Sequence, residues 1–232
     1  MTALGWPPGE HGFARFLREN GLSIAALSLF VLSLVGQAIC GYRVTNEERR
    51  EHQQAELGFA AYLASGDFVE ATFENWESEF LQMALFVMLT RFLRQKGSSE
   101  SKKLDQEEAV DRDPRADVRP DSPWPVRRGG VVLALYQRSL FVSLMLLFAL
   151  SFALHGVGGA LKHNQEAARH GGASESVLSY FATADFWFES FQNWQSEFLS
   201  MAALVLLSIV LREQGSPQSK PVAAPHSETG ES

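Results

Sequence analysis

Two long runs without a charged residue constrain this chain more than any other feature of its sequence. Residues 21–42 and 139–161 contain no Asp, Glu, Lys or Arg. A helix needs roughly 20 mostly apolar residues to cross the hydrocarbon core of a bilayer, which is about 30 Å thick. Both runs meet this requirement, so the sequence predicts an integral membrane protein that contacts the lipid bilayer.

The two halves of the sequence match each other without a gap when they are offset by 118 positions. Residues 16–102 pair with residues 134–220, and 32 of these 87 pairs are identical. The best-matched stretch pairs residues 75–84 with residues 193–202. A gapless match of this length indicates a duplicated structural unit.

Each copy also contains a second, shorter apolar run, at 80–93 and at 198–211. Two spans return the chain to the side on which a copy began, so both copies enter the membrane in the same direction. The predicted fold is all-α: an integral membrane four-helix bundle of two tandem parallel helical-hairpin repeats with pseudo-twofold symmetry. The predicted segments are a first hairpin at 16–104, a linker at 105–133, a second hairpin at 134–220 and a tail at 221–232.

Positive charge is distributed unequally between the two sides of these predicted spans. Of the 20 Lys and Arg residues, 15 lie on the side of the termini and the linker, and 5 lie on the other side. Short cytoplasmic segments carry the excess of Lys and Arg in membrane proteins. The predicted location is therefore the bacterial inner (plasma) membrane, with both termini cytoplasmic.

The linker and the tail lack the apolar residues that a core requires. Residues 97–128 contain four prolines among dense mixed charges. Such segments do not bury enough surface to offset the entropy of ordering the chain. We predict a disordered linker and a flexible tail.

The second run of each copy is too short to span on its own. Fourteen residues (80–93) make about 21 Å of helix at 1.5 Å per residue. The helix is predicted to start earlier, with Asp67 and Glu70 as a capping pair and Asp185 in the same place in the second copy. Polar residues then enter the membrane near its outer surface.

These polar residues form the candidate intramembrane site. In the first copy, the polar residues are three and four positions apart, so they form a polar stripe along one face of the helix. The second copy has a polar stripe at the matching positions. Each first span adds one polar residue at a matching position. The candidate residues are Asn75, Ser78, Glu79, Gln82, Asn193, Ser196, Glu197, Ser200, Gln37 and His155.

Two interpretations of the acidic pair in this stripe remain open. A carboxylate within a span is costly, and Glu79 and Glu197 facing each other across the symmetry axis could share a proton or coordinate a cation. Alternatively, these glutamates point into interfacial water, or hold neighbouring helices together by hydrogen bonds.

The outer loops offer a separate candidate metal site. Glu48 and His52 are four residues apart, and Glu166 and His170 repeat this spacing. On helices, each pair would share a face, and the two pairs together would supply four ligands. The alternative is a solvated extension of each helix with ordinary polar residues.

Several function classes are disfavoured by the rest of the sequence. The net charge of −7 argues against nucleic-acid binding, and the one cysteine, Cys40, excludes an internal disulfide. The sequence contains no nucleophile–base triad, phosphate-binding loop or HExxH motif. We therefore expect neither an enzyme nor a bound cofactor.

Four stretches of the sequence resemble an uncharacterised family of bacterial multi-pass membrane proteins: residues 16–23, 35–37, 70–82 and 97–102. The Asn-Trp-x-Ser-Glu-Phe signature occurs at 75–80 and again at 193–198. The second copy departs from the first, because Gln192 and Gln195 stand where the first has Glu74 and Glu77. The resemblance implies location and topology, and no reaction.

The sequence favours a multi-pass inner-membrane protein with a structural or interaction role, alone, as a homo-oligomer or with another membrane partner. The alternative is a small channel or a proton- or cation-coupled carrier that uses Glu79 and Glu197.

The orientation leads to a first prediction. A reporter fused after residue 110 should be active only in its cytoplasmic form, because 11 of the 20 Lys and Arg residues lie between residues 91 and 138. Paired fusions of a cytoplasmic and a periplasmic reporter measure this. A periplasmic signal at this position would reverse the predicted topology.

Overall fold

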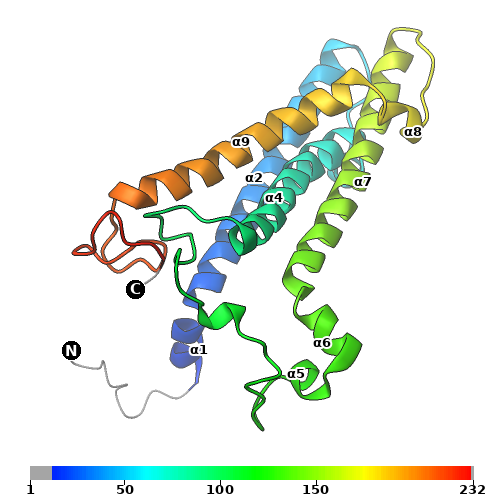
Figure 1. Ribbon diagram of the computed structural model, residues 1–232. Helices are drawn as coiled ribbons and strands as arrows, with labels where there is room; N and C mark the ends of the chain where they lie inside the picture. Colours follow the sequence, from blue (N-terminus) through cyan, green and yellow to red (C-terminus); the bar gives the residue numbers. More distant parts are fainter. Residues whose placement is uncertain (1–11, 231–232) are drawn as a thin grey trace. The chain divides into compact units, whose positions relative to one another are not determined.

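The computed structural model describes residues 12–230, which are mostly helical and contain no strand (Figure 1). The chain forms two compact units, Met1–Phe68 and Val69–Ser232, and each is described by itself. The first unit contains α1 (Phe13–Glu19), α2 (Gly21–Glu51), α3 (Phe59–Leu63) and the start of α4 (Gly66–Phe92). The second unit contains the rest of α4, a 3-10 turn (Ala109–Asp111), α5 (Trp124–Arg128), α6 (Gly130–Tyr136), α7 (Ser139–Arg169), α8 (Val177–Tyr180) and α9 (Ala184–Val210).

Three of the described helices are long and apolar enough to cross a membrane: α2, α7 and α9. This confirms the predicted all-helical class with apolar helices. The remaining predicted span lies in α4, which has 27 residues but does not meet the same criterion. The reason is its content of acidic residues: Glu70, Glu74, Glu77 and Glu79 all lie in its first half.

Large apolar side chains on the long helices of the second unit face outward. Leu146 on α7 is 65% exposed and Leu199 on α9 is 71% exposed. Soluble proteins rarely expose contiguous apolar surface on this scale. The surfaces of α7 and α9 therefore suit lipid rather than water.

The long helices recur at the spacing of the sequence match. Both ends of α7 lie 118 residues after the ends of α2, and both ends of α9 lie 118 residues after those of α4. The loop contacts recur as well. The Asn46 side chain bonds the backbone N–H and C=O of Leu57, and the Asn164 side chain bonds the same groups of Glu175.

The predicted capping residues of α4 and α9 are wrong. The hydroxyl of Ser65 accepts a hydrogen bond from the Phe68 N–H, and the hydroxyl of Thr183 accepts one from the Phe186 N–H. Hydroxyl side chains satisfy the first free N–H groups of a helix as well as Asp does. Both caps lie two residues before the predicted Asp67 and Asp185, and Glu70 is left to make other contacts.

The predicted linker and tail contain little regular structure. Residues 105–133 include the 3-10 turn, α5 and the start of α6. The tail contacts the segment that follows α4, where the Gly230 N–H donates to the Ser98 carbonyl (3.0 Å) and Thr229 Oγ1 accepts from the Gly97 N–H (2.8 Å). The last two residues of the predicted tail lie outside the described residues.

A glycine–tyrosine contact occurs in each unit. In the first, a Cβ added to Gly41 would collide with the hydroxyl oxygen of Tyr62, while the next ring atom, Cζ, would lie at 3.1 Å. In the second, a Cβ added to Gly159 would collide with ring carbons of Tyr180. The helix therefore approaches the tyrosine closely in both units, and only a glycine allows this.

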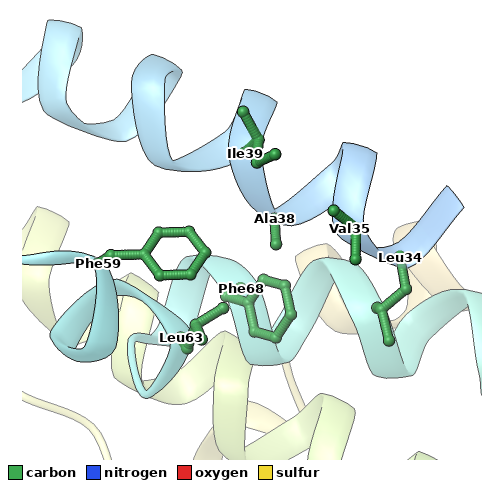
Figure 2. Close-up of a pocket in the computed structure, with 7 residues that line it drawn as sticks. All are labelled: Leu34, Val35, Ala38, Ile39, Phe59, Leu63 and Phe68. Atoms are coloured by element: carbon green, nitrogen blue, oxygen red, sulfur yellow. The ribbon is translucent and has the colours of Figure 1, made fainter. Parts of the chain in front are cut away.

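The first unit also contains a cavity of about 510 Å³ beside this contact. Figure 2 shows that α2 supplies Leu34, Val35, Ala38 and Ile39, and that Phe59, Leu63 and Phe68 lie opposite. Every lining side chain is apolar. Such a cavity offers no polar group to a ligand, so it is not a candidate binding site for a charged substrate.

The glycine contacts lead to a second prediction. Gly41→Ala should cost about 1–3 kcal/mol of stability, as overpacking does, and adding Tyr62→Phe should restore most of it because the colliding oxygen is removed. Gly159→Ala should not be restored by Tyr180→Phe, because ring carbons collide there. Thermal unfolding of the four variants in detergent, followed by circular dichroism, measures the difference. Equal rescue in both pairs would contradict the described contacts.

Candidate functional site

Small residues on α7 allow α4 to pack closely against it within the second unit. The buried face of α7 includes Gly156, Gly158, Gly159 and Ala160. A Cβ added to Gly158 would collide with the backbone of Glu70. Small residues of this kind allow close helix contacts in membranes. The glutamates in the first half of α4 are thereby brought against the middle of α7.

His155 on α7 lies at the centre of the polar groups gathered there. Its Nδ1 lies 3.1 Å from Oε2 of Glu77 on α4, and its Nε2 lies 3.3 Å from Oε2 of Glu189 on α9. The side chains of His155 and Glu77 are fully buried. One imidazole therefore connects three helices, with a carboxylate at each ring nitrogen.

Two aromatic side chains complete the hydrogen bonds of these carboxylates. The indole N–H of Trp194 donates to Oε1 of Glu77 (3.3 Å), and the hydroxyl of Tyr180 donates to Oε2 of Glu189 (3.2 Å). Burial raises the pKa of Tyr180, and the negative charges of Glu189 and Glu70 raise it further. Tyr180 therefore keeps its proton and acts as a hydrogen-bond donor.

An ion pair lies at the more exposed end of this group. Lys162 on α7 donates to Oε2 of Glu70 (2.6 Å), and the Tyr180 hydroxyl lies 3.5 Å from Oε1 of the same glutamate. The Lys162 side chain is 36% exposed, whereas that of Glu70 is 4% exposed. Lys162 therefore lies between the buried groups and the surface.

We call these residues the histidine–carboxylate network: Glu70, Glu74, Glu77, His155, Lys162, Tyr180, Glu189 and Trp194. Its members come from α4, α7, α8 and α9, all in the second unit. It contains four carboxylates, one lysine and one histidine. With all four carboxyl groups ionised and His155 protonated, negative charge exceeds positive charge by two. Buried charge of one sign is costly unless a counter-charge neutralises it, so the network favours the uptake of a cation.

The structure brings together one part of the predicted polar stripe. The carboxyl groups of Glu79 and Glu197 lie close enough to interact with each other. Other stripe residues bond the backbone of their own helix: Asn75 to Ala71, Ser78 to Asn75, Asn193 to Glu189, Ser196 to Asn193 and Ser200 to Glu197. Gln82 is partly buried on α4.

The two candidates from the first spans belong to different units. Gln37 belongs to the first unit, and His155 bonds Glu77 and Glu189 rather than Glu79 or Glu197. The predicted outer pairs are likewise divided between the units: Glu48 and His52 belong to the first, and Glu166 and His170 to the second. All four are exposed, and His52 Nδ1 contacts the backbone carbonyl of Glu48 rather than its carboxylate.

Most of the network was not predicted from the sequence, although one signal for it is present. Glu70, Glu74 and Glu77 are four and three residues apart, which places them on one face of a helix. The predicted site instead consists of residues that match between the two copies. At the matching positions of the second copy stand Phe188, Gln192 and Gln195, so this acidic face has no counterpart there.

A family model described as "Domain of unknown function (DUF6766)" matches residues 13–231. The chain belongs to this family. The match covers both halves of the sequence, and it confirms the resemblance to an uncharacterised family. DUF6766 carries no assigned activity, so the chemistry of this member is argued from its residues. No curated protein and no solved structure matches the chain.

The ion pair of the network leads to a third prediction. Lys162→Met should destabilise the protein by about 2 kcal/mol, because it leaves Glu70 buried without its partner. This is less than the 3–5 kcal/mol typical of a fully buried pair, since Lys162 is partly exposed. Adding Glu70→Gln should recover most of the loss. Thermal unfolding in detergent measures both, and additive effects of the two substitutions would show that the pair is not coupled.

Proposed function

We propose that this DUF6766 protein is a multi-pass membrane protein that binds and transfers protons at His155, as a small channel or a cation-coupled carrier. The observation that carries the proposal is the position of His155, fully buried between Glu77 and Glu189. Histidine changes its charge near neutral pH, and ionisable groups within membrane helices commonly form proton relays. In this proposal the protein is not an enzyme.

A continuous series of contacts supports a route from the surface to this histidine. Partly exposed Lys162 contacts Glu70, and Tyr180 contacts both Glu70 and Glu189. Glu189 in turn contacts His155. In this proposal, protons pass along these groups between Lys162, at the predicted outer end of α7, and His155, about two turns further into the helix.

The proposed architecture is the duplicated one predicted from the sequence. The 118-residue offset of the helix ends and the matching Asn46 and Asn164 contacts support two copies of one hairpin. We propose that α4 is the fourth span, inserted together with α7 and α9. Lys162 and His155 of α7 pair with Glu70 and Glu77, and Trp194 of α9 donates a hydrogen bond to Glu77. We also propose the bacterial inner membrane and cytoplasmic termini, which the distribution of Lys and Arg supports.

Two other functions remain in competition. The hydrogen bonds of the network also join three helices, which favours a purely structural role or an interaction role. The proximity of Glu79 and Glu197 favours a proton or cation route through that pair instead. Each competing function predicts a different pattern among variants.

The fourth prediction separates them. Proton uptake into proteoliposomes containing a pH-sensitive dye, under an imposed membrane potential, should occur with the wild type and fall at least tenfold with His155→Gln. Glutamine keeps hydrogen-bonding capacity but does not change its charge, and it is the residue found at the matching position, Gln37. The matched control is His170→Gln, the same substitution at the exposed end of α7, and it should keep wild-type flux.

The same assay includes Glu79→Gln/Glu197→Gln. Loss of flux in this double variant, with full flux in His155→Gln, would move the route to the acidic pair. Absence of flux in the wild type would favour the structural role. Helix content and elution volume in detergent are compared for every variant, so that a folding defect is recognised.

A further inference from the structure

We propose that the histidine–carboxylate network also binds a divalent first-row transition metal, with His155 Nε2, Glu74 and Glu189 as the protein ligands. This inference names the cation and rests on the proposed function of the same site. One ligand atom from each of these residues lies within 4.8 Å of the others. The three ligands come from α7, α4 and α9, so a metal there would join all three helices.

The surroundings of His155 match those of a metal-bound histidine. A metal-ligating imidazole usually donates its other ring N–H to a carboxylate, which fixes the orientation of the ring. Glu77 occupies this position, 3.1 Å from Nδ1, and is itself held by Trp194. The Nε2 atom is thereby directed toward Glu189. In this arrangement Glu77 is a positioning residue rather than a ligand.

The second ligand is also held in place. Oε2 of Glu189 accepts from the Tyr180 hydroxyl and lies 3.3 Å from His155 Nε2. Two ligands at 2.0–2.2 Å from a tetrahedral metal lie about 3.4 Å apart, so this pair already has a suitable separation. Glu74 is partly buried, and one of its carboxylate oxygens lies within 4.8 Å of the other two ligand atoms.

Charge favours a divalent ion over a proton alone. Glu70 is neutralised by Lys162, which leaves Glu74, Glu77 and Glu189 around His155. With these three carboxyl groups ionised, one proton on the histidine leaves a net charge of −2 in this group, whereas a divalent cation on a neutral histidine leaves −1. Because the group is largely buried, the smaller residual charge is the more stable one.

The donor set selects the class of metal. One imidazole nitrogen and carboxylate oxygens suit Zn²⁺, Mn²⁺ or Fe²⁺, and the absence of sulfur among these ligands disfavours Cu⁺. Mg²⁺ and Ca²⁺ prefer oxygen ligands only. A metal also requires deprotonated ligands, so it competes with protons for the same atoms. This competition would couple metal movement to proton movement.

The fifth prediction concerns direct binding of Zn²⁺ to the full-length protein, purified in detergent and freed of metal with a chelator. Titration calorimetry should show one site per chain. Glu74→Gln should weaken the affinity at least tenfold, and Glu77→Gln by 10- to 100-fold, as the loss of an orienting partner does. The matched control is Asp185→Asn, an exposed acid one turn before Glu189 on α9, and it should bind as the wild type does.

Two further measurements identify the ligand and the metal class. Co²⁺ should give visible absorption bands with the wild type that are lost with His155→Gln, because the nitrogen ligand is removed. Mg²⁺ at millimolar concentration should not displace Zn²⁺. Binding that is unchanged in Glu74→Gln, or that is lost in Glu166→Gln/His170→Gln, would overturn the inference, as would displacement by Mg²⁺.

The results also separate this inference from the proposed function. Proton flux that depends on His155, without Zn²⁺ binding, would leave the proposed function standing and remove the metal. Zn²⁺ binding that depends on Glu74, without proton flux, would leave the metal site and remove the proton route.

Discussion

The contact of one buried imidazole with two carboxylates is the interaction on which the second unit depends. His155 lies on α7, Glu77 on α4 and Glu189 on α9, so that each long helix supplies one member. Removal of any one leaves a buried polar group without its partner, which costs more than the bond itself contributes. The small residues of α7 make the contact possible, because a side chain at Gly158 would hold α4 away. The close packing of α4 on α7 and the contacts of His155 with the two carboxylates therefore depend on each other.

Much of the fold could be predicted from the sequence, and the centre of the site could not. Apolar run length identifies α2 and α7 directly, because span length is set by bilayer thickness. The offset of 118 residues aligns the ends of α4 with those of α9. His155 was identified as a polar residue in a span, but its partners depend on which faces of three helices meet. Spacing along one helix does not contain this information, so Glu189 was missed.

The two copies have diverged where the structure is most informative. At matching positions the first copy has Leu34, Ala38 and Leu63, and the second has Phe152, Gly156 and Phe181. In the second unit, Phe152 stacks on Phe181 with ring centroids 5.4 Å apart, and Gly156 makes room for the ring of Phe181. In the first unit, Leu34 and Leu63 are smaller than the phenylalanines at the matching positions, and both line the cavity of Figure 2. The acidic face of α4 is likewise specific to one copy, and His155 and Lys162 of α7 stand where α2 has Gln37 and Val44. The residues that match between the two copies therefore predict the architecture, and the residues that differ include the histidine and the charged residues of the histidine–carboxylate network.

These differences make the two hairpins dependent on each other. A charged residue near the middle of a spanning helix costs about 2.5–3.5 kcal/mol on insertion scales, and α4 carries several glutamates on one face. The residues that neutralise or bond them, Lys162 and His155, lie on α7. The boundary between compact units accordingly falls at the start of α4, between Phe68 and Val69, and not in the linker between the copies. Within the second unit, the buried glutamates of α4 therefore depend on α7 for their ion pair and their contact with an imidazole.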